Sequence, residues 1–258
     1  MSERVRLTKA GAVARVEICR DDRHNALDAE TSIQLLDRCW QVAADESVRV
    51  LILAGAGSTF GVGGDLGELH AGGAEAARQV IEPLNAAVGV LTRMAAPTIV
   101  KLQGHVAGGS LSLALACDFV IAADSTRFTL AYTNIGATAD LGGSWHLPRL
   151  MGFRKAIHFA LLNTTLSSQQ AFDQGLVSEV VVEAMLESRV AEVAAQLAKA
   201  PVQALRGMKE LLRDALDRRL DAQLDAELHA FLDCARTDDF REGVEAVLQK
   251  RAPKFQTL

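Results

Sequence analysis

Residues 103–118 decide the fold, and they read Gln-Gly-His-Val-Ala-Gly-Gly-Ser-Leu-Ser-Leu-Ala-Leu-Ala-Cys-Asp. A turn of small residues lies between an apolar segment at 97–102, which predicts a buried strand, and an apolar run at 111–117, which predicts a buried helix. Gly108 and Gly109 therefore stand where a strand passes into a helix N-terminus. Free N–H groups and the positive end of the helix dipole point outward there. The stretch predicts a site for an anion or for an oxyanion that develops during a reaction.

A second glycine loop precedes it and follows the same logic. Residues 60–66 read Phe-Gly-Val-Gly-Gly-Asp-Leu and come after an apolar strand predicted at 48–54. Either loop alone is more often a turn that needs glycine for its backbone conformation. Two turns at strand ends, however, can each give one N–H to the same carbonyl oxygen. The pair therefore predicts an oxyanion-binding site.

Composition narrows the class of protein. The chain has 258 residues, of which 49% are hydrophobic and 23% charged, and this is ordinary for a globular protein of one large domain or a domain with an appendage. The net charge of −5 argues against nucleic acid as the main partner. Without an apolar leader or a membrane-length apolar run, we expect a cytoplasmic protein with no membrane partner.

Cysteine and histidine spacing indicates neither disulfides nor a metal site. The four cysteines show no C-x-x-C spacing and are interpreted as reduced thiols in core positions. The six histidines show no H-E-x-x-H or similar spacing. We therefore expect no metal.

Strands alternate with helices along most of the chain, which indicates parallel βαβ units. The expected elements are a hairpin within 5–18, a helix capped by Asp28 with an apolar face at Ile33, Leu36, Cys39, Trp40 and Ala43, a helix at 74–92, a strand at 118–122, a helix at 154–162 and a strand at 180–182. Long helical patterns follow at 185–200, 202–219 and 221–235. We place a core at 1–190 and a helical part at 191–258, which packs on the core or on another subunit.

Segments spread over nearly the whole chain resemble, in order, the crotonase superfamily, also called the enoyl-CoA hydratase/isomerase family. They are Arg23-His-Asn-Ala-Leu27, the loop 60–66, the turn 103–109, Gly142-Gly-Ser-Trp-His-Leu-Pro-Arg149, Ala171–Val177 and the tail Glu242–Phe255. The resemblance implies an α/β fold with a ββα spiral core. It also implies a helical C-terminal trimerisation region, hence a homotrimer or a dimer of trimers.

The resemblance further implies an acyl-CoA thioester as the substrate, with no cofactor other than the coenzyme A that the substrate carries. On the family pattern the N–H groups of Gly64 and Gly109 polarise the thioester carbonyl and stabilise an enolate-like intermediate. Arg23 and Lys254 are candidate cations for the phosphates of CoA. Each of them could equally be an ordinary surface charge in contact with water. The remaining implied CoA- and substrate-binding residues are Ala26, Leu27, Gly63, Asp65, Leu66, Gly108, Ser112, Tyr132 and Phe255.

The chain departs from a hydratase of this family at both catalytic glutamates. By motif count these positions are Ser112 and Tyr132. A hydroxyl cannot replace a carboxylate base near neutral pH without strong activation. Asp140 instead resembles the aspartate of the branch that contains 2-(1,2-epoxyphenyl)acetyl-CoA isomerase and the Δ3,Δ2-enoyl-CoA isomerases. One acid suits a proton shift between two carbons. We therefore predict an isomerase of an enoyl-CoA or of a related acyl-CoA, such as one derived from an aromatic compound, with Asp140 as the acid/base.

Four other interpretations stay open. The chain could be a hydratase with relocated catalytic groups, or an aryl-CoA dehalogenase in which Asp140 attacks as a nucleophile. The dehalogenase branch uses a histidine where motif counting places Asn85. The chain could also bind acyl-CoA without catalysis. Finally, Asp140 could be a turn residue that caps the helix near Gly142.

Overall fold

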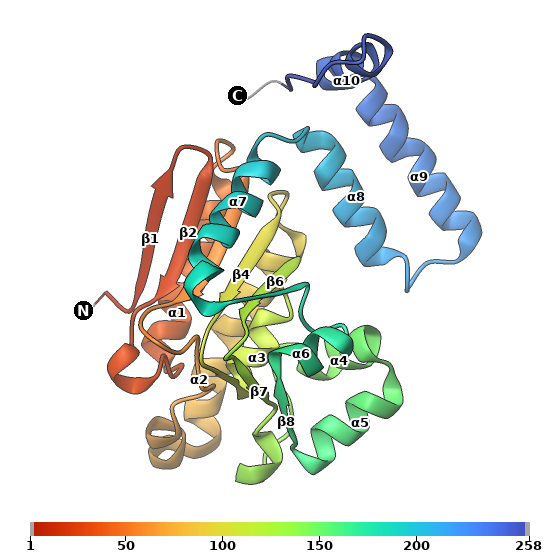
Figure 1. Ribbon diagram of the computed structural model, residues 1–258. Helices are drawn as coiled ribbons and strands as arrows, with labels where there is room; N and C mark the ends of the chain where they lie inside the picture. The colour runs from red at the N-terminus through yellow and green to blue at the C-terminus, as the bar shows by residue number, and fades with distance from the viewer. Residues whose placement is uncertain (1–2, 256–258) are drawn as a thin grey trace.

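Two sheets build the core of the molecule, and the computed structural model describes residues 3–255 (Figure 1). The larger sheet has six strands in the order β1-β2-β3-β4-β6-β9, parallel except for the antiparallel pair β1 and β2. Its strands are β1 (Val5–Ala10), β2 (Val13–Ile18), β3 (Val50–Gly55), β4 (Thr98–Leu102), β6 (Phe119–Ala123) and β9 (Glu179–Val181). The smaller sheet comprises β5 (His105–Ala107), β7 (Arg127–Thr129) and β8 (Thr165–Ser167), in that order.

A repeated unit connects the two sheets. Strand β4 of the larger sheet runs into β5 of the smaller one and then into helix α3 (Gly108–Ala114), and β6 runs in the same way into β7. After β3 the chain makes one bridge to the smaller sheet, Gly61 to Val106, before helix α2 (Leu66–Arg93) begins. This succession of a strand in each sheet followed by a helix is the ββα spiral, and the expected α/β fold is confirmed.

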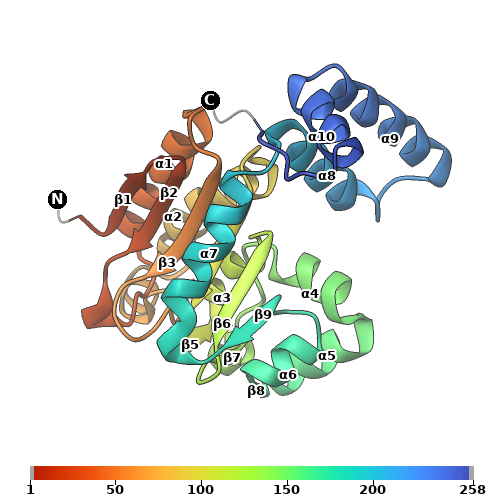
Figure 2. The ribbon, with the colours of Figure 1, turned by 45° about the horizontal axis from the view of Figure 1, so that its top comes forward.

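Side chains from both faces of the larger sheet are buried. In β3, Leu51 and Leu53 belong to the main hydrophobic cluster, and Val50 and Ile52 belong to a second cluster on the other face. Successive side chains of a strand alternate between faces, so a strand covered on both sides is apolar throughout. Helices α1 (Ala29–Ala44) and α2 contribute to the main cluster, and α7 (Leu186–Ala198) lies across the second (Figure 2). Helix α7 thus packs on the sheet across the expected boundary at residue 190.

Helix α1 confirms the expected cap and corrects the expected face. The Asp28 side chain accepts a hydrogen bond from the Thr31 N–H at 2.8 Å. Ile33 and Trp40, however, are each 58% exposed. The expected face is confirmed at Cys39, which is buried, and at Leu36, which packs against the main cluster. It is wrong at Ile33, Trp40 and Ala43: Thr31 and Ser32, with hydroxyls bonded to Asp28, occupy the buried side of the first turn instead. The residues of α1 that are buried are Thr31, Ser32, Leu35, Cys39 and Val42.

The middle of the chain adds four short helices around the smaller sheet. They are η2 (Tyr132–Ile135), α4 (Gly143–Met151), α5 (Phe153–Leu162) and α6 (Ser168–Asp173). A capping box opens α6, in which Ser167 and Gln170 bond each other's backbone N–H groups. Helix α4 begins directly after the loop that contains Asp140.

The C-terminal helices extend away from the sheets (Figure 1). They are α8 (Val202–Asp214), α9 (Leu220–Ala235) and α10 (Asp238–Leu248). Helix α8 is tied to the core by an ion pair of 2.7 Å between Lys209 and Asp118 and by a bond from Arg213 to the Thr92 carbonyl. Large apolar side chains of α8, of α9 and of the segment between them are more than half exposed: Met208, Leu212, Leu216, Leu220, Leu224, Leu228 and Phe231. No helix within residues 3–255 is long and apolar enough to cross a membrane.

These exposed apolar side chains predict an oligomer, most simply a trimer or a dimer of trimers. An exposed apolar surface of this extent on a folded chain marks an interface with another protein. Light scattering at micromolar concentration should give a mass of at least three chains. Replacing Leu212 and Leu216 together by glutamate should lower that mass, because burying two unpaired carboxylates is unfavourable. A wild-type protein that runs as a single monomeric species would contradict the prediction.

Candidate active site

Three segments far apart in sequence lie side by side at the ends of the strands. The Leu27 N–H donates to the Gly63 carbonyl at 2.8 Å, and the Asp65 N–H donates to the Leu27 carbonyl at 2.9 Å. The Ala107 N–H donates to the Gly61 carbonyl at 3.0 Å. The turn at 26–27, the loop 60–66 and the turn 104–110 are therefore joined by backbone hydrogen bonds, and the two glycine loops meet as the sequence predicts.

The loops approach closely at Gly63, where both the backbone conformation and the space favour glycine. Its φ is +93°, a conformation that side-chain-bearing residues rarely adopt. A Cβ at this position would stand 3.1 Å from the Gly109 nitrogen and 3.2 Å from the Ala107 oxygen. The Gly63 N–H donates to the buried hydroxyl of Ser110 at 3.0 Å. Ser110 thus fixes the first loop on the second, a role that no pattern in the sequence indicates.

Two backbone N–H groups beside this contact have no partner in the described chain. The Gly64 N–H donates to no group within residues 3–255. Gly109 is the second residue of α3, so its N–H has no carbonyl to bond within the helix. Gly64 and Gly109 both line a cavity of about 490 Å³. They are placed as the two donors of an oxyanion site would be.

Asp140 is the only carboxyl group that lines this cavity in the described chain. The walls near it are otherwise largely apolar and include Leu66, Leu69, Ala77, Val80, Ile81 and Ile135. Leu66 and Gly63, both expected to bind substrate, are thereby placed at the cavity, as are Gly108 and Tyr132. Ala26 and Leu27 are buried behind it.

A hydrogen-bonded chain joins three residues that the sequence analysis considered separately. The Tyr132 phenol donates to Asp140 Oδ1, and the Ser112 hydroxyl lies 3.1 Å from the Tyr132 oxygen. Burial raises the pKa of Asp140 above its ordinary value, and the hydrogen bond from Tyr132 partly opposes that rise. Burial and the neighbouring carboxylate raise the pKa of Tyr132, so it remains a protonated phenol at neutral pH.

The side chain of Asp140 does not cap helix α4. The Asp140 main-chain carbonyl accepts the Gly143 N–H at 2.9 Å, and the N-cap residue of α4 is Gly142, which makes no side-chain cap. The carboxyl group instead contacts Tyr132. The interpretation of Asp140 as a turn residue with a capping side chain is therefore wrong, since the turn uses only its backbone.

Asp65 performs the capping role in the first loop. Its carboxylate accepts hydrogen bonds from the Gly67 and Glu68 N–H groups at the start of α2. It also pairs at 3.0 Å with Arg20, whose guanidinium donates to the Ala26 carbonyl and lies 3.2 Å from Asp28. Asp65 does not line the cavity. The sequence did not point to Arg20, because the family-like segment begins at Arg23.

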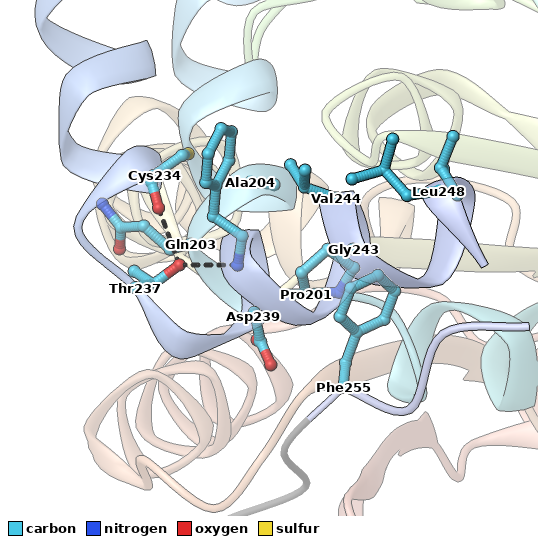
Figure 3. Close-up of a pocket in the computed structure, with 12 residues that line it drawn as sticks. Pro201, Gln203, Ala204, Cys234, Thr237, Asp239, Gly243, Val244, Leu248 and Phe255 are labelled. Carbon is cyan, nitrogen blue, oxygen red and sulfur yellow. Dashed lines mark hydrogen bonds between the residues drawn. The ribbon is translucent and has the colours of Figure 1, made fainter.

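The other expected binding residues lie outside the cavity. The Arg23 side chain is 71% exposed beside Asp22. The Lys254 N–H donates to Glu242, and Phe255 lies in a separate apolar pocket between α8 and α10, beside Gly243 (Figure 3).

Two further features of the site region bear on its chemistry. Asn85 lines another cavity, together with Trp145 and His146, rather than the one that contains Asp140. Within residues 3–255, no group of three or more His, Cys, Asp and Glu side chains is placed to hold a metal ion.

The chain is similar to several known proteins. Residues 8–257 match the model of a family described as enoyl-CoA hydratase/isomerase. A 1,2-epoxyphenylacetyl-CoA isomerase of Escherichia coli is 36% identical over 240 residues, which cover 92% of each chain. A 4-chlorobenzoyl coenzyme A dehalogenase of an Arthrobacter species is 34% identical over 200 residues, 76% of this chain and 72% of that one. A solved enoyl-CoA hydratase from a Polaromonas species superposes with a TM-score of 0.93 and 30% identity over 98% and 99% of the two chains.

The contact between Gly63 and Gly109 predicts an unusually costly alanine substitution. Gly63→Ala should lower the free energy of unfolding by about 2–4 kcal/mol, from backbone strain and from crowding of the Gly109 nitrogen. Gly11 is the matched control, since its φ is +59° and a Cβ there would meet nothing within 4 Å. Gly11→Ala should cost about 1–2 kcal/mol. Urea unfolding of both variants measures the difference, and equal losses would contradict the crowding argument.

Proposed function

The chain belongs to the enoyl-CoA hydratase/isomerase family of acyl-CoA enzymes, and we propose that it isomerises an enoyl-CoA or a related, aromatic-derived acyl-CoA. The supporting observation is the pairing of two unpartnered glycine N–H groups with a single carboxyl group in one cavity. A proton shift next to a thioester needs one acid/base and one oxyanion site. We propose that the enzyme needs no cofactor other than the CoA of its substrate and that it acts in the cytoplasm.

In this mechanism the thioester oxygen accepts hydrogen bonds from Gly64 and Gly109. The Asp140 carboxylate removes a proton from C2 of a 3-enoyl-CoA. The electron pair of the broken C–H bond delocalises into the thioester as an enolate, whose negative oxygen the two N–H groups stabilise. Asp140, now protonated, returns the proton to C4 as the C3–C4 double bond moves to C2–C3. The product is an isomer of the substrate, and no water or other reactant is consumed.

The surroundings of Asp140 suit both halves of this task. Its pKa is raised by burial, so its carboxylate is a stronger base than an exposed aspartate. The same raised pKa favours the protonated form, which holds the proton between its removal and its return. The site has no second carboxyl group in the described chain to activate water, and the hydroxyls at the hydratase positions, Ser112 and Tyr132, bond each other. Hydration therefore has less support than isomerisation.

Dehalogenation is the second candidate, because two dehalogenases are among the similar proteins. It would use Asp140 as a nucleophile toward an aromatic ring. Asn85 stands where that branch uses histidine, and it faces a different cavity.

For CoA itself, we propose that Arg23 contacts the phosphates near Ala26, and that Lys254 and Phe255 contribute through the C-terminal segment of this or a neighbouring subunit.

Three substrates test the proposal. Incubation with a 3-enoyl-CoA should produce the conjugated 2-enoyl absorbance. A 2-enoyl-CoA should keep most of that absorbance, since loss by hydration would indicate a hydratase. With 4-chlorobenzoyl-CoA we expect no chloride release. Binding of all three without any conversion would indicate a non-catalytic acyl-CoA-binding protein.

Asp140→Asn should lower kcat for isomerisation by about 10²–10⁴-fold, which is the usual contribution of a positioned acid/base. The change is nearly isosteric, and both glycine N–H groups remain, so the KM should change little. Asp173→Asn is a matched control, because Asp173 is exposed on α6 and bonds only Gln169. Steady-state kinetics on both variants decide the matter. An Asp140→Asn enzyme with near-wild-type turnover defeats the assignment.

A further inference from the structure

We propose that Tyr132 is a positioning residue for Asp140: its phenol holds carboxyl oxygen Oδ1 and leaves Oδ2 to exchange the proton with substrate. This inference rests on the proposed acid/base role of Asp140. Tyr132 is 7% exposed, and its hydroxyl donates to Asp140 Oδ1. Asp140 Oδ2 accepts no hydrogen bond from another residue of the described chain.

The neighbours of Tyr132 fix the direction of this hydrogen bond. A phenol has one proton to give, and a carboxylate can only accept. Tyr132 therefore donates to Asp140 and accepts from Ser112, whose oxygen lies 3.1 Å away. Ser112 is itself fully buried, and a side chain at Gly143 would collide with its hydroxyl. The order of donation, Ser112 to Tyr132 to Asp140, is thereby set by buried groups that cannot turn to water.

The backbone around both partners is held in an uncommon conformation. Ala131, immediately before Tyr132, has a φ of +63°, and Leu141, immediately after Asp140, has a φ of +49°. Residues other than glycine rarely adopt such angles, and they persist where the surrounding structure over-determines them. The Ala131 N–H donates to Asn163 Oδ1 at 2.6 Å, which secures one of these turns. The two strained positions flank the two ends of the hydrogen bond, so the fold aims Tyr132 at Asp140.

The other packed elements bring no competing charge to Asp140. Helix α3 (Gly108–Ala114) carries no ionisable side chain, and in η2 Tyr132 is the only one. The residues of α2 that line the cavity are apolar. On α4, burial lowers the pKa of His146 to about 4, so its ring is neutral at pH 7. The Arg149 guanidinium stacks on Trp145 at 3.9 Å and pairs with Asp217.

The hydrogen bond has a consequence for titration that packing alone would not have. It stabilises the ionised carboxylate, so its removal raises the pKa of Asp140. Isomerisation requires the carboxylate, so activity falls as the pH drops below that pKa. A higher pKa therefore moves the acidic limb of the pH profile to higher pH. A merely structural Tyr132 would lower activity at all pH values alike.

Tyr132→Phe removes only the hydroxyl and is the first test. We expect the acidic limb of kcat/KM to move up by about one pH unit, the size that a hydrogen bond to a charged group supports. We expect kcat to fall about tenfold because the carboxyl group is freer to rotate, with KM within twofold of wild type. Thr133→Ala is the matched control: Thr133 is the exposed next residue of η2, and its loss should leave both quantities unchanged.

A second test uses the fact that Tyr132 is the only tyrosine of the chain. Expression with 3-fluorotyrosine in place of tyrosine alters this single position and keeps the ring and hydroxyl. Its phenol is more acidic and donates a stronger hydrogen bond, so the acidic limb should move to lower pH, opposite to Tyr132→Phe. The single fluorine NMR signal should shift with pH as Asp140 ionises, and Asp140→Asn should abolish that titration.

The outcomes separate the two proposals. A pH profile unchanged by both substitutions, or a fluorine signal that ignores Asp140→Asn, overturns the role of Tyr132 while leaving the isomerase assignment intact if Asp140→Asn is inactive. An active Asp140→Asn enzyme overturns the isomerase assignment, and the fluorine titration still reports whether the hydrogen bond exists. If Tyr132→Phe does not fold, the fluorotyrosine protein carries both the pH profile and the NMR measurement.

Discussion

The contact between Gly63 and the N-terminus of α3 is the constraint on which the rest of the site depends. Two loops from different strands must approach within van der Waals distance for their free N–H groups to reach one oxygen atom. The approach disfavours a side chain at Gly63, since a Cβ would crowd the Gly109 nitrogen at 3.1 Å. It also needs a partner for the Gly63 N–H, which the Ser110 hydroxyl supplies. The bridge from Gly61 to Val106, a residue of the smaller sheet, holds the two loops together.

A cluster of charged residues supports the first loop from the side away from the cavity. Arg20 lies behind the loop, where it pairs with Asp65 and Asp28 and bonds the Ala26 carbonyl. Removing one partner of such a cluster leaves a part-buried charge uncompensated, which is costly. Holding Asp65 in this cluster keeps it away from the cavity, so Asp140 is the one carboxylate there in the described chain. A single charged group among apolar walls feels a low dielectric, which strengthens its hydrogen bond with Tyr132.

Local sequence patterns predicted the strands of the larger sheet and the two glycine loops. The apolar alternation of β1 and β2, the continuous apolar run of β3 and the glycines at the strand ends are patterns that backbone geometry imposes. The face of α1 was not predictable by hydrophobicity, because Thr31 and Ser32 are buried through hydroxyl bonds to Asp28. The contact between Tyr132 and Asp140 could not be predicted from the sequence for a different reason. It depends on positive φ angles at Ala131 and Leu141, and alanine and leucine give no sign of such turns.

Similar proteins are named isomerase, hydratase and dehalogenase. Such a range is compatible with a site in which the backbone binds the oxyanion and a side chain serves as the acid/base group. In the proposed site the oxyanion donors are backbone N–H groups, which glycine at a strand-to-helix turn provides independently of the acid/base group. The acid/base group is a side chain, and it can enter the cavity from α3, from η2 or from the loop before α4. In this chain α3 and η2 offer Ser112 and Tyr132, and the loop offers Asp140. The hydroxyls cannot move a proton at neutral pH themselves, but they can orient the group that does. In the proposed mechanism the two hydroxyls and the loop carboxylate therefore form one arrangement, in which Ser112 and Tyr132 act through Asp140.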